Sequence, residues 1–157
     1  MALWMEAQMG EMPDVLDTQL LQTIHAPLVV TPTERGRLRK FLERLGTAWY
    51  GFGWRSYDYA GHRIVGHRGG INGYRSLILF DPAKKSGVVA LWNSNTSQPG
   101  GLEFEVMDRI YRLPFRDWLE LSKAPGAPAP TELPESEAAP NVAENGGPAN
   151  GSASTGH

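Results

Sequence analysis

The stretch that decides the fold runs from Arg63 to Asn95 and reads RIVGHRGGINGYRSLILFDPAKKSGVVALWNSN. Apolar and polar residues alternate through much of it, as they do in a strand whose two faces meet different surroundings. The pattern predicts strands over 63–67 and 74–80, and the continuous apolar run 88–92 predicts a third strand covered on both faces. Glycines and the segment DPAKKSG supply the turns. We therefore expect an antiparallel meander.

The segment before this stretch predicts helices, and so does the segment after it. TPTERGRLRKFLERLG begins with Thr31 as N-cap, followed by Pro32 and by Glu34 at the capping-box position, and it predicts a helix that Gly46 ends. DTQLLQTIH predicts a shorter helix before it. Apolar residues at spacings of three and four predict a closing helix over 101–113.

The segment YGFGWRSYDYA, residues 50–60, changes from a helical period to a period of two. It places Phe52 and Trp54 on one face of a strand and, after a change of phase, Tyr57 and Tyr59 on the other. Helices before the sheet and one helix after it are typical of an α+β domain in which helix packs on one face of an antiparallel sheet.

The chain divides into two parts by composition. Residues 124–157 are dominated by Pro, Ala, Gly, Ser and Glu, which bury too little apolar surface to offset chain entropy, so we expect a disordered low-complexity tail there. Residues 1–123 form the expected domain, with helices over 1–48, the sheet over 50–93 and the closing helix over 101–113.

Composition also limits the partners. The chain carries 15 Lys and Arg against 17 Asp and Glu, so no chain-wide field attracts nucleic acid. It has no cysteine for a disulfide or a thiolate metal site. No apolar run approaches the roughly 20 residues of a membrane helix, and the first residues lack the basic start of a signal peptide. His62 and His67, five apart on a strand, face opposite ways and predict no metal site. We expect no cofactor.

Glycines gather at the end of the strand 63–67. Gly69 and Gly70 follow it directly, and Gly73 comes four residues after Gly69. Glycines at a strand end let a ligand or another backbone approach closely. Backbone N–H groups on an exposed edge can stabilise the oxyanion of a tetrahedral intermediate. A bulged hairpin explains the same glycines without any function.

The order of these features resembles the carboxy-terminal part of the serine β-lactamase and penicillin-binding-protein superfamily, most closely its class C and esterase-like members. In that family a YGxGW strand precedes a strand that ends in K-T-G or H-x-G. A glycine turn, a long strand, a proline-containing hairpin and an apolar strand ending in Asn then follow. The matching segments here are YGFGW (50–54), HRG (67–69), the turn 70–74, the hairpin 81–87 and the strand 88–93.

The resemblance implies roles for five residues. His67 stands where the third box of the family has its lysine, beside the nucleophile and the substrate, with Arg68 and Gly69 completing the box as substrate-binding residues. Gly70 would give the second oxyanion-hole N–H, and Asn93 would lie near the substrate carboxylate. Histidine, with a reference pKa of about 6.5, is a weaker cation than lysine, which favours ester or peptide hydrolysis over β-lactam hydrolysis. Each residue also has an interpretation without function. His67 could be a turn histidine that hydrogen-bonds to the backbone, and Asn93 could be a turn residue whose amide does the same.

The family's chemistry needs a serine nucleophile with a lysine three residues later, S-x-x-K, and a second box, Y-x-N or S-x-N. Neither pattern occurs in this sequence. We therefore expect the carboxy-terminal fragment of a β-lactamase-related hydrolase that is inactive alone. Its partner would be the amino-terminal part of the same fold, and its substrate a small ester, amide or peptide. The parent family is commonly extracytoplasmic, and the sequence leaves the localisation of this chain open.

A second hypothesis comes from a different class of protein. The glycine-edged strand and aromatic residues such as Trp54 and Trp92 could bind a peptide or a glycan without catalysis. In the resembling family an amino-terminal strand pairs with the strand that corresponds to 88–92. Without that neighbour the edge of the strand would be open, and self-association through it is expected.

Overall fold

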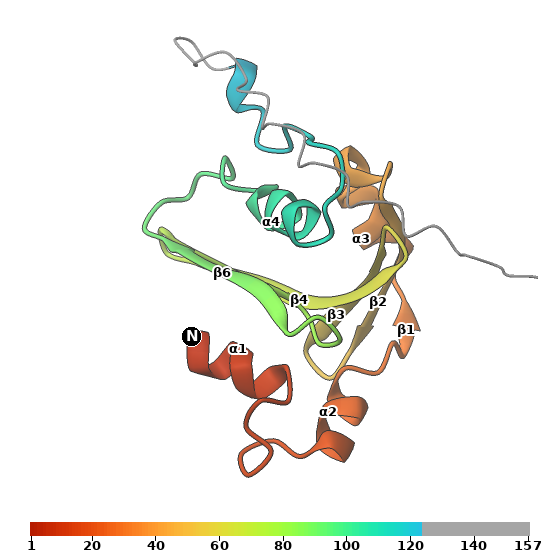
Figure 1. Ribbon diagram of the computed structural model, residues 1–157. Coiled ribbons are helices and arrows are strands. Elements are labelled where there is room, and N and C mark those ends of the chain that lie inside the picture. Colours follow the sequence, from red (N-terminus) through yellow and green to blue (C-terminus); the bar gives the residue numbers. More distant parts are fainter. Residues whose placement is uncertain (124–157) are drawn as a thin grey trace, which may run out of the picture. The chain divides into compact units, whose positions relative to one another are not determined.

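The computed structural model describes residues 1–123, and the tail predicted over 124–157 lies outside the described residues. Its central element is a six-stranded antiparallel sheet in which each strand pairs with its neighbours in sequence (Figure 1). The predicted antiparallel meander and the α+β class are thus confirmed. The strands are β1 (Val29–Val30), β2 (Leu45–Gly51), β3 (Trp54–Tyr59), β4 (His62–Ile71), β5 (Tyr74–Asp81) and β6 (Ser86–Trp92).

Three of the turns are two-residue hairpins made by a residue followed by glycine. In Phe52–Gly53 the φ angles are 47° and 82°, in Ala60–Gly61 they are 50° and 81°, and in Asn72–Gly73 they are 41° and 87°. Two positive φ angles define the turn whose twist matches that of the flanking strands. Glycine adopts such a φ without strain, so the glycines fix where each strand reverses.

The single strand predicted over 50–60 is wrong, because the Phe52–Gly53 turn divides it into β2 and β3. Phe52 is 63% exposed at the tip of this hairpin, whereas Trp54 begins β3 and packs against the core. Tyr57 and Tyr59 are both buried on one face of β3, as the alternation predicts. The change of phase in the sequence is therefore the reversal of the chain.

The bulged hairpin that would explain the glycines of β4 is also wrong. The pairing of β4 with β5 runs without interruption from Val65 opposite Phe80 to Ile71 opposite Tyr74. Gly69 lies inside this ladder, opposite Ser76, and not at an irregularity. A bulge therefore does not explain the glycine at this position. The explanation is its contact with Ser76, described with the candidate site below.

Four α-helices and two short 3₁₀ helices accompany the sheet. Asp17 caps the second α-helix, since its Oδ1 accepts a hydrogen bond from the Leu20 N–H at 2.8 Å. None of the helices within residues 1–123 is long and apolar enough to cross a membrane. The α-helices are α1 (Ala2–Gln8), α2 (Thr18–Ile24), α3 (Pro32–Arg37) and α4 (Leu102–Ile110), and the 3₁₀ helices are Arg39–Phe41 and Leu121–Lys123.

The helix predicted from Thr31 to Gly46 is wrong in its second half. The Thr31 side chain makes no capping hydrogen bond, α3 has only six residues, and Gly46 lies inside β2. Such a short helix has little stability of its own, so tertiary packing decides the path of the chain. Leu38 and Phe41 are buried although the chain has left the α-helix at Leu38. The sheet accordingly begins well before residue 50.

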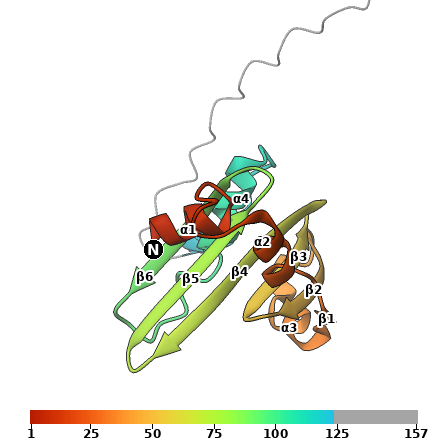
Figure 2. The same ribbon diagram turned by 90° about the horizontal axis from the view of Figure 1, so that it is seen from below.

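Helices cover both faces of the sheet, rather than the one face expected from the sequence. Figures 1 and 2 show α3 and α4 on one face and α1 and α2 on the other. The core on the α4 face includes Phe41, Tyr59 and Phe104, and the core on the α1 face joins Met9 to Val65, Ile78 and Phe80. This three-layer arrangement buries both sides of the central strands.

The strand β6 forms one edge of the sheet, and within residues 1–123 only β5 pairs with it. The α4 helix contacts it on one side and α1 on the other. Its residues are mostly half-buried, and Leu91 is 63% exposed. The expectation that this strand is covered on both faces therefore fails at its end, beyond the reach of the two helices.

A buried polar cluster fastens α4 to the sheet. Asp108 is 3% exposed and accepts hydrogen bonds from the Tyr59 hydroxyl and from Trp118 Nε1, each at 2.6 Å, while Arg44 forms an ion pair with the same carboxylate. Burial and the neighbouring carboxylate raise the pKa of Tyr59, so its hydroxyl remains a donor. The cluster ties strand, helix and the segment after the helix together.

A second polar contact joins the two helices of the opposite face. The half-buried His25 shares a 2.8 Å hydrogen bond between its Nε2 and Gln8 Oε1, and its ring lies 5.5 Å from the rings of both Trp54 and Phe80. Burial lowers the pKa of His25 to about 4. The imidazole is therefore neutral at pH 7.

Candidate functional site

The second half of β4 forms an open edge inside the fold. β3 pairs with β4 only from His62 to Gly66, whereas β5 pairs with it as far as Ile71. Within residues 1–123, the segment 67–71 thus has a strand on one side alone. Every second residue of such a segment directs its backbone N–H and C=O away from the paired strand. An extended substrate could pair with these groups.

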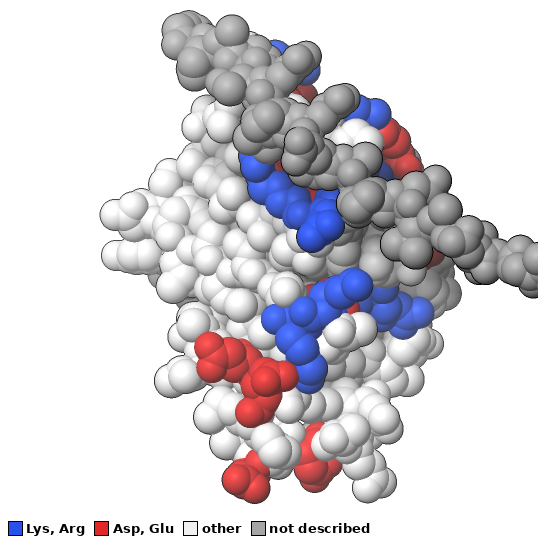
Figure 3. All heavy atoms as spheres, in the orientation of Figure 1, with Lys and Arg blue, Asp and Glu red and all other residues white. Residues whose placement is uncertain are grey.

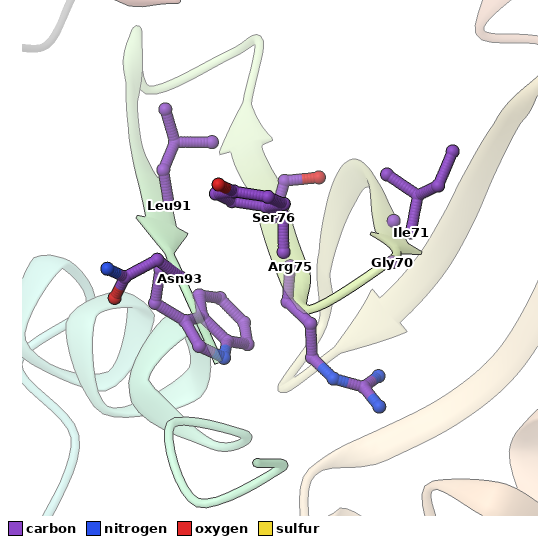
Figure 4. A pocket seen from close by; sticks show the side chains of 9 residues that line it. Gly70, Ile71, Arg75, Ser76, Leu91 and Asn93 are labelled. Carbon is purple, nitrogen blue, oxygen red and sulfur yellow. The ribbon is translucent and has the colours of Figure 1, made fainter. Parts of the chain in front are cut away.

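A trough of about 470 Å³ lies at this end of the sheet, where β4, β5 and β6 come together (Figure 4). Three of the five residues predicted to form the site, Gly69, Gly70 and Asn93, line it. In Figure 2, α1 and α2 cross the sheet elsewhere and leave this end uncovered. The remaining lining residues are Ile71, Tyr74, Arg75, Ser76, Leu91 and Trp92.

The floor of the trough is made of small residues that face each other across two strands. Gly69 pairs with Ser76, and Ser76 pairs with Leu91. A Cβ added to Gly69 would lie 2.8 Å from the Ser76 Oγ, too close without a shift of one of them. Because Gly69 has no side chain, the depression is deeper at this point and the two strands can pair without a clash.

His67 lies one row further along the same face of the sheet. It pairs with Ile78, whose side chain belongs to the core on the α1 face, and residues 67 and 69 share a face because strand side chains alternate. The imidazole is half-buried, and its ring centre lies 6.3 Å from that of Tyr50. His67 thus lies on the face of the trough but one row away from it, and it does not line the trough itself.

Arg68 faces the other way. Its guanidinium forms an ion pair with Glu103 of α4, and it lies 6.0 Å from the ring centre of Phe104. The Glu103 carboxylate is 3% exposed and also accepts the Gly101 N–H at 3.0 Å. Arg68 therefore anchors β4 to α4 on the face opposite His67, and its side chain does not reach the trough.

The loop after β6 is held by its own neighbours. Arg75 Nε donates to the Asn95 carbonyl at 2.9 Å, and Trp92 Nε1 donates to the Thr96 carbonyl at 3.1 Å. Figure 4 shows the Arg75 side chain on the opposite side of the strands from Leu91. Asn93 follows β6 at the start of this loop and is exposed at the rim of the trough.

The sequence reasoning missed the apolar walls of the trough. Ile71, Tyr74 and Leu91 are 71%, 64% and 63% exposed, although each belongs to a strand that elsewhere packs in the core. Alternation alone places Ile71 on the face of Gly69, so this part could have been found from the sequence. That Leu91 comes to the same place depends on the register of β5 with β6.

Within residues 1–123 no three His, Asp or Glu side chains lie close enough to hold a metal ion. The groups present at this end of the sheet are the backbone N–H and C=O of the open edge, the His67 imidazole and the side chains that line the trough.

Comparisons with known proteins agree with the order of these features. A family model described as Beta-lactamase matches residues 1–111. An unguisins hydrolase of Aspergillus violaceofuscus (strain CBS 115571) is 41% identical over 71 residues, which cover 43% of this chain and 12% of that protein. No solved structure gives a significant match. Since the family model spans more than half of the chain, the resemblance seen in the sequence is confirmed, and the chain belongs to the β-lactamase family.

Proposed function

We propose that this chain provides part of the active site of a β-lactamase-related serine hydrolase and has no hydrolytic activity by itself. The observation that carries the proposal is the open edge of β4, which joins His67 to the Gly69–Gly70 pair beside a trough of ligand size. The serine and lysine of an S-x-x-K segment, which these 157 residues lack, would come from another segment.

The proposed reaction passes through an acyl-enzyme. The serine hydroxyl attacks the carbonyl carbon of an ester or amide as the lysine amine takes its proton, and the carbonyl oxygen becomes an oxyanion. The Gly70 N–H stabilises that oxyanion, because a fixed backbone donor needs no reorganisation as the charge develops. The leaving group departs with a proton, and water then releases the acyl group. His67 lies beside the substrate and orients it or passes the proton.

The substrate proposed here is a small ester, amide or peptide. The relative is named for the hydrolysis of unguisins, and it shares only a short stretch with this chain. Within residues 1–123 the trough receives no lysine side chain, and the guanidinium groups of Arg68 and Arg75 are both engaged elsewhere. This arrangement supports ester or peptide hydrolysis rather than recognition of an anionic β-lactam.

The proposed partner is the amino-terminal part of the same fold, which would carry the S-x-x-K serine and add a strand at the edge of β6. The edge carries no charged residue from Ser86 to Trp92, so few features oppose strand addition. If no such part is present, the same edge favours association of two copies of the chain. Both proposals rest on the side of β6 that pairs with no strand within residues 1–123.

A non-catalytic binding module is the second candidate, favoured by the missing nucleophile and by the aromatic lining of the trough. Tyr74 lines the trough, is 64% exposed and could stack on a peptide or glycan. Trp92 pairs with Arg75 on the other face, and its Nε1 donates to the Thr96 carbonyl. Trp54 packs against Phe80 and His25 within the core on the α1 face, so it is not available for a ligand. The binding surface would then be the trough alone.

The test is to combine the chain with a separately expressed segment of a family member that carries S-x-x-K. We expect a serine-directed fluorophosphonate to label that segment only when this chain is present, and a chromogenic ester to be hydrolysed by the mixture but not by the chain alone. His67→Ala should lower the rate about tenfold to a hundredfold, whereas His62→Ala, at the other end of β4, should leave it unchanged.

Three results would contradict the proposal. Ester hydrolysis by the purified chain alone would show that it holds a nucleophile of its own. Equal rates for the His67→Ala and wild-type mixtures would remove His67 from the site. Labelling that does not depend on this chain would leave the binding module as the better account.

A further inference from the structure

The walls of the trough are apolar, and this has a consequence for the substrate. Ile71 and Tyr74 flank the tip of the β4–β5 hairpin, Leu91 lies on the neighbouring β6, and all three are more than half exposed. The rows of the same face nearer to α1 bury their apolar residues in the core. Three strands thus present unburied apolar side chains around one depression, with the small Gly69 and Ser76 as its floor.

Charge is absent from the inside of the trough. Arg75 is the only charged residue that lines it within the described part of the chain, and its guanidinium is directed away to the Asn95 carbonyl. Figure 3 shows no acidic or basic side chain over the end of the sheet where β4, β5 and β6 meet in Figure 1. A carboxylate placed here would lose hydration without gaining a partner.

We infer that the trough binds an uncharged apolar or aromatic group of the ester or amide substrate, and that Ile71, Tyr74 and Leu91 set this preference. Its volume of about 470 Å³ suits a phenyl or branched aliphatic group together with the adjoining amide. The inference rests on the proposed function, because the open edge of β4 beside Gly69 and Gly70 is where the scissile group would lie. It adds the class of side group that the enzyme selects.

The test measures binding to the whole chain, which requires no nucleophile. N-acetyl-phenylalaninamide, N-acetyl-glycinamide and N-acetyl-phenylalanine are titrated separately into the ¹⁵N-labelled chain. We expect the neutral aromatic amide to shift the amide resonances of Gly69, Gly70 and Leu91, and the glycine compound to shift none. The free acid should bind at least threefold more weakly than the aromatic amide, because its carboxylate finds no cation.

Variants of exposed residues distinguish binding in the trough from non-specific hydrophobic binding elsewhere on the surface. Leu91→Asn should raise the dissociation constant of the aromatic amide about tenfold, the effect of losing one buried aliphatic contact. Ser76→Leu should abolish the shifts by filling the floor. Val29→Asn is the matched control, since Val29 is 62% exposed on the edge strand at the far side of the sheet, and it should leave binding unchanged.

The result that overturns the inference is equal binding of the glycine and phenylalanine compounds, or tighter binding of the free acid. Resonances of the trough that shift with protein concentration in the absence of ligand would also overturn it, because they would show a second copy in the trough. Hydrolysis by the complemented chain without preference for phenyl over methyl side groups would overturn the inference and leave the proposed function intact. If complementation fails but the binding preference is observed, the proposed function is overturned and the binding preference of the trough stands.

Discussion

The ion pair between Arg68 and Glu103 gives the sharpest test of how this site is built. The Arg68 side chain is 44% exposed, and the Glu103 carboxylate, at the start of α4, is 3% exposed. Removing one partner of a fully buried pair costs about 3 to 5 kcal/mol, because the other charge is left without compensation. Water can reach this pair from the Arg68 side, so we expect about 2 kcal/mol for Arg68→Met.

A double-mutant cycle isolates the pair. Glu103→Gln keeps an acceptor for the Gly101 N–H and leaves the exposed guanidinium free to hydrate, so it should cost about 1 kcal/mol. The double variant should then be less destabilised than the sum of the two single variants, with a coupling of about 1 kcal/mol. Urea unfolding followed by tryptophan fluorescence measures all four free energies of unfolding.

The control and the refuting result follow from the exposure of each arginine. Arg37, whose side chain is 73% exposed in α3, should change the free energy of unfolding by less than about 0.5 kcal/mol when replaced by Met. If Arg68 stabilises the packing of α4 on β4 without touching the ligand, Arg68→Met should leave the affinity for N-acetyl-phenylalaninamide unchanged at temperatures where the variant is folded. A coupling below about 0.5 kcal/mol together with a tenfold loss of ligand affinity would show instead that Arg68 binds the substrate.

Two further predictions concern the polar contacts in the core. Asp108→Asn leaves one acceptor oxygen for three buried donors, the Tyr59 hydroxyl, Trp118 Nε1 and the Arg44 guanidinium. It should lower the free energy of unfolding by about 3 kcal/mol in urea. The exposed Asp14→Asn should cost less than about 0.5 kcal/mol. The pKa of His25 is about 4 in the folded chain, below its value when unfolded, so the unfolded state binds more protons between these values. Stability should therefore fall as the pH is lowered from about 6.5 to 4, and His25→Gln should flatten that part of the profile; equal slopes for both proteins would contradict the assignment.

The sequence by itself determined the features that depend on near neighbours. The turns at Ala60–Gly61 and Asn72–Gly73 follow from glycine's tolerance of positive φ, and the strands between them follow from a period of two. The order of motifs around His67 was enough to indicate the family, and the Gly69–Gly70 pair marked the strand end that lines the trough. These signals are local, because each depends on the backbone preferences of a few consecutive residues.

The path of the chain between Thr31 and Leu45 could not be obtained in this way. The capping pattern and the apolar spacing both favour one long helix, yet α3 ends at Arg37 and Leu38 and Phe41 are buried from a 3₁₀ turn. Burial in the core on the α4 face, which includes residues far away in sequence, outweighs the local preference for a longer helix. Helix propensity does not decide the conformation where another course of the backbone buries more apolar surface.

The chemistry of the trough was decided by tertiary structure alone. Leu91 reaches the face of Gly69 only because β5 pairs with both strands in a fixed register, and a slip of one residue would turn it to the other face. The Arg68 side chain turns away from the trough because α4 brings a buried Glu103 to the opposite side of β4. Alternation within one strand assigns residues to two faces, but which face meets a helix and which meets a ligand depends on long-range packing, because that packing fixes what lies above each row.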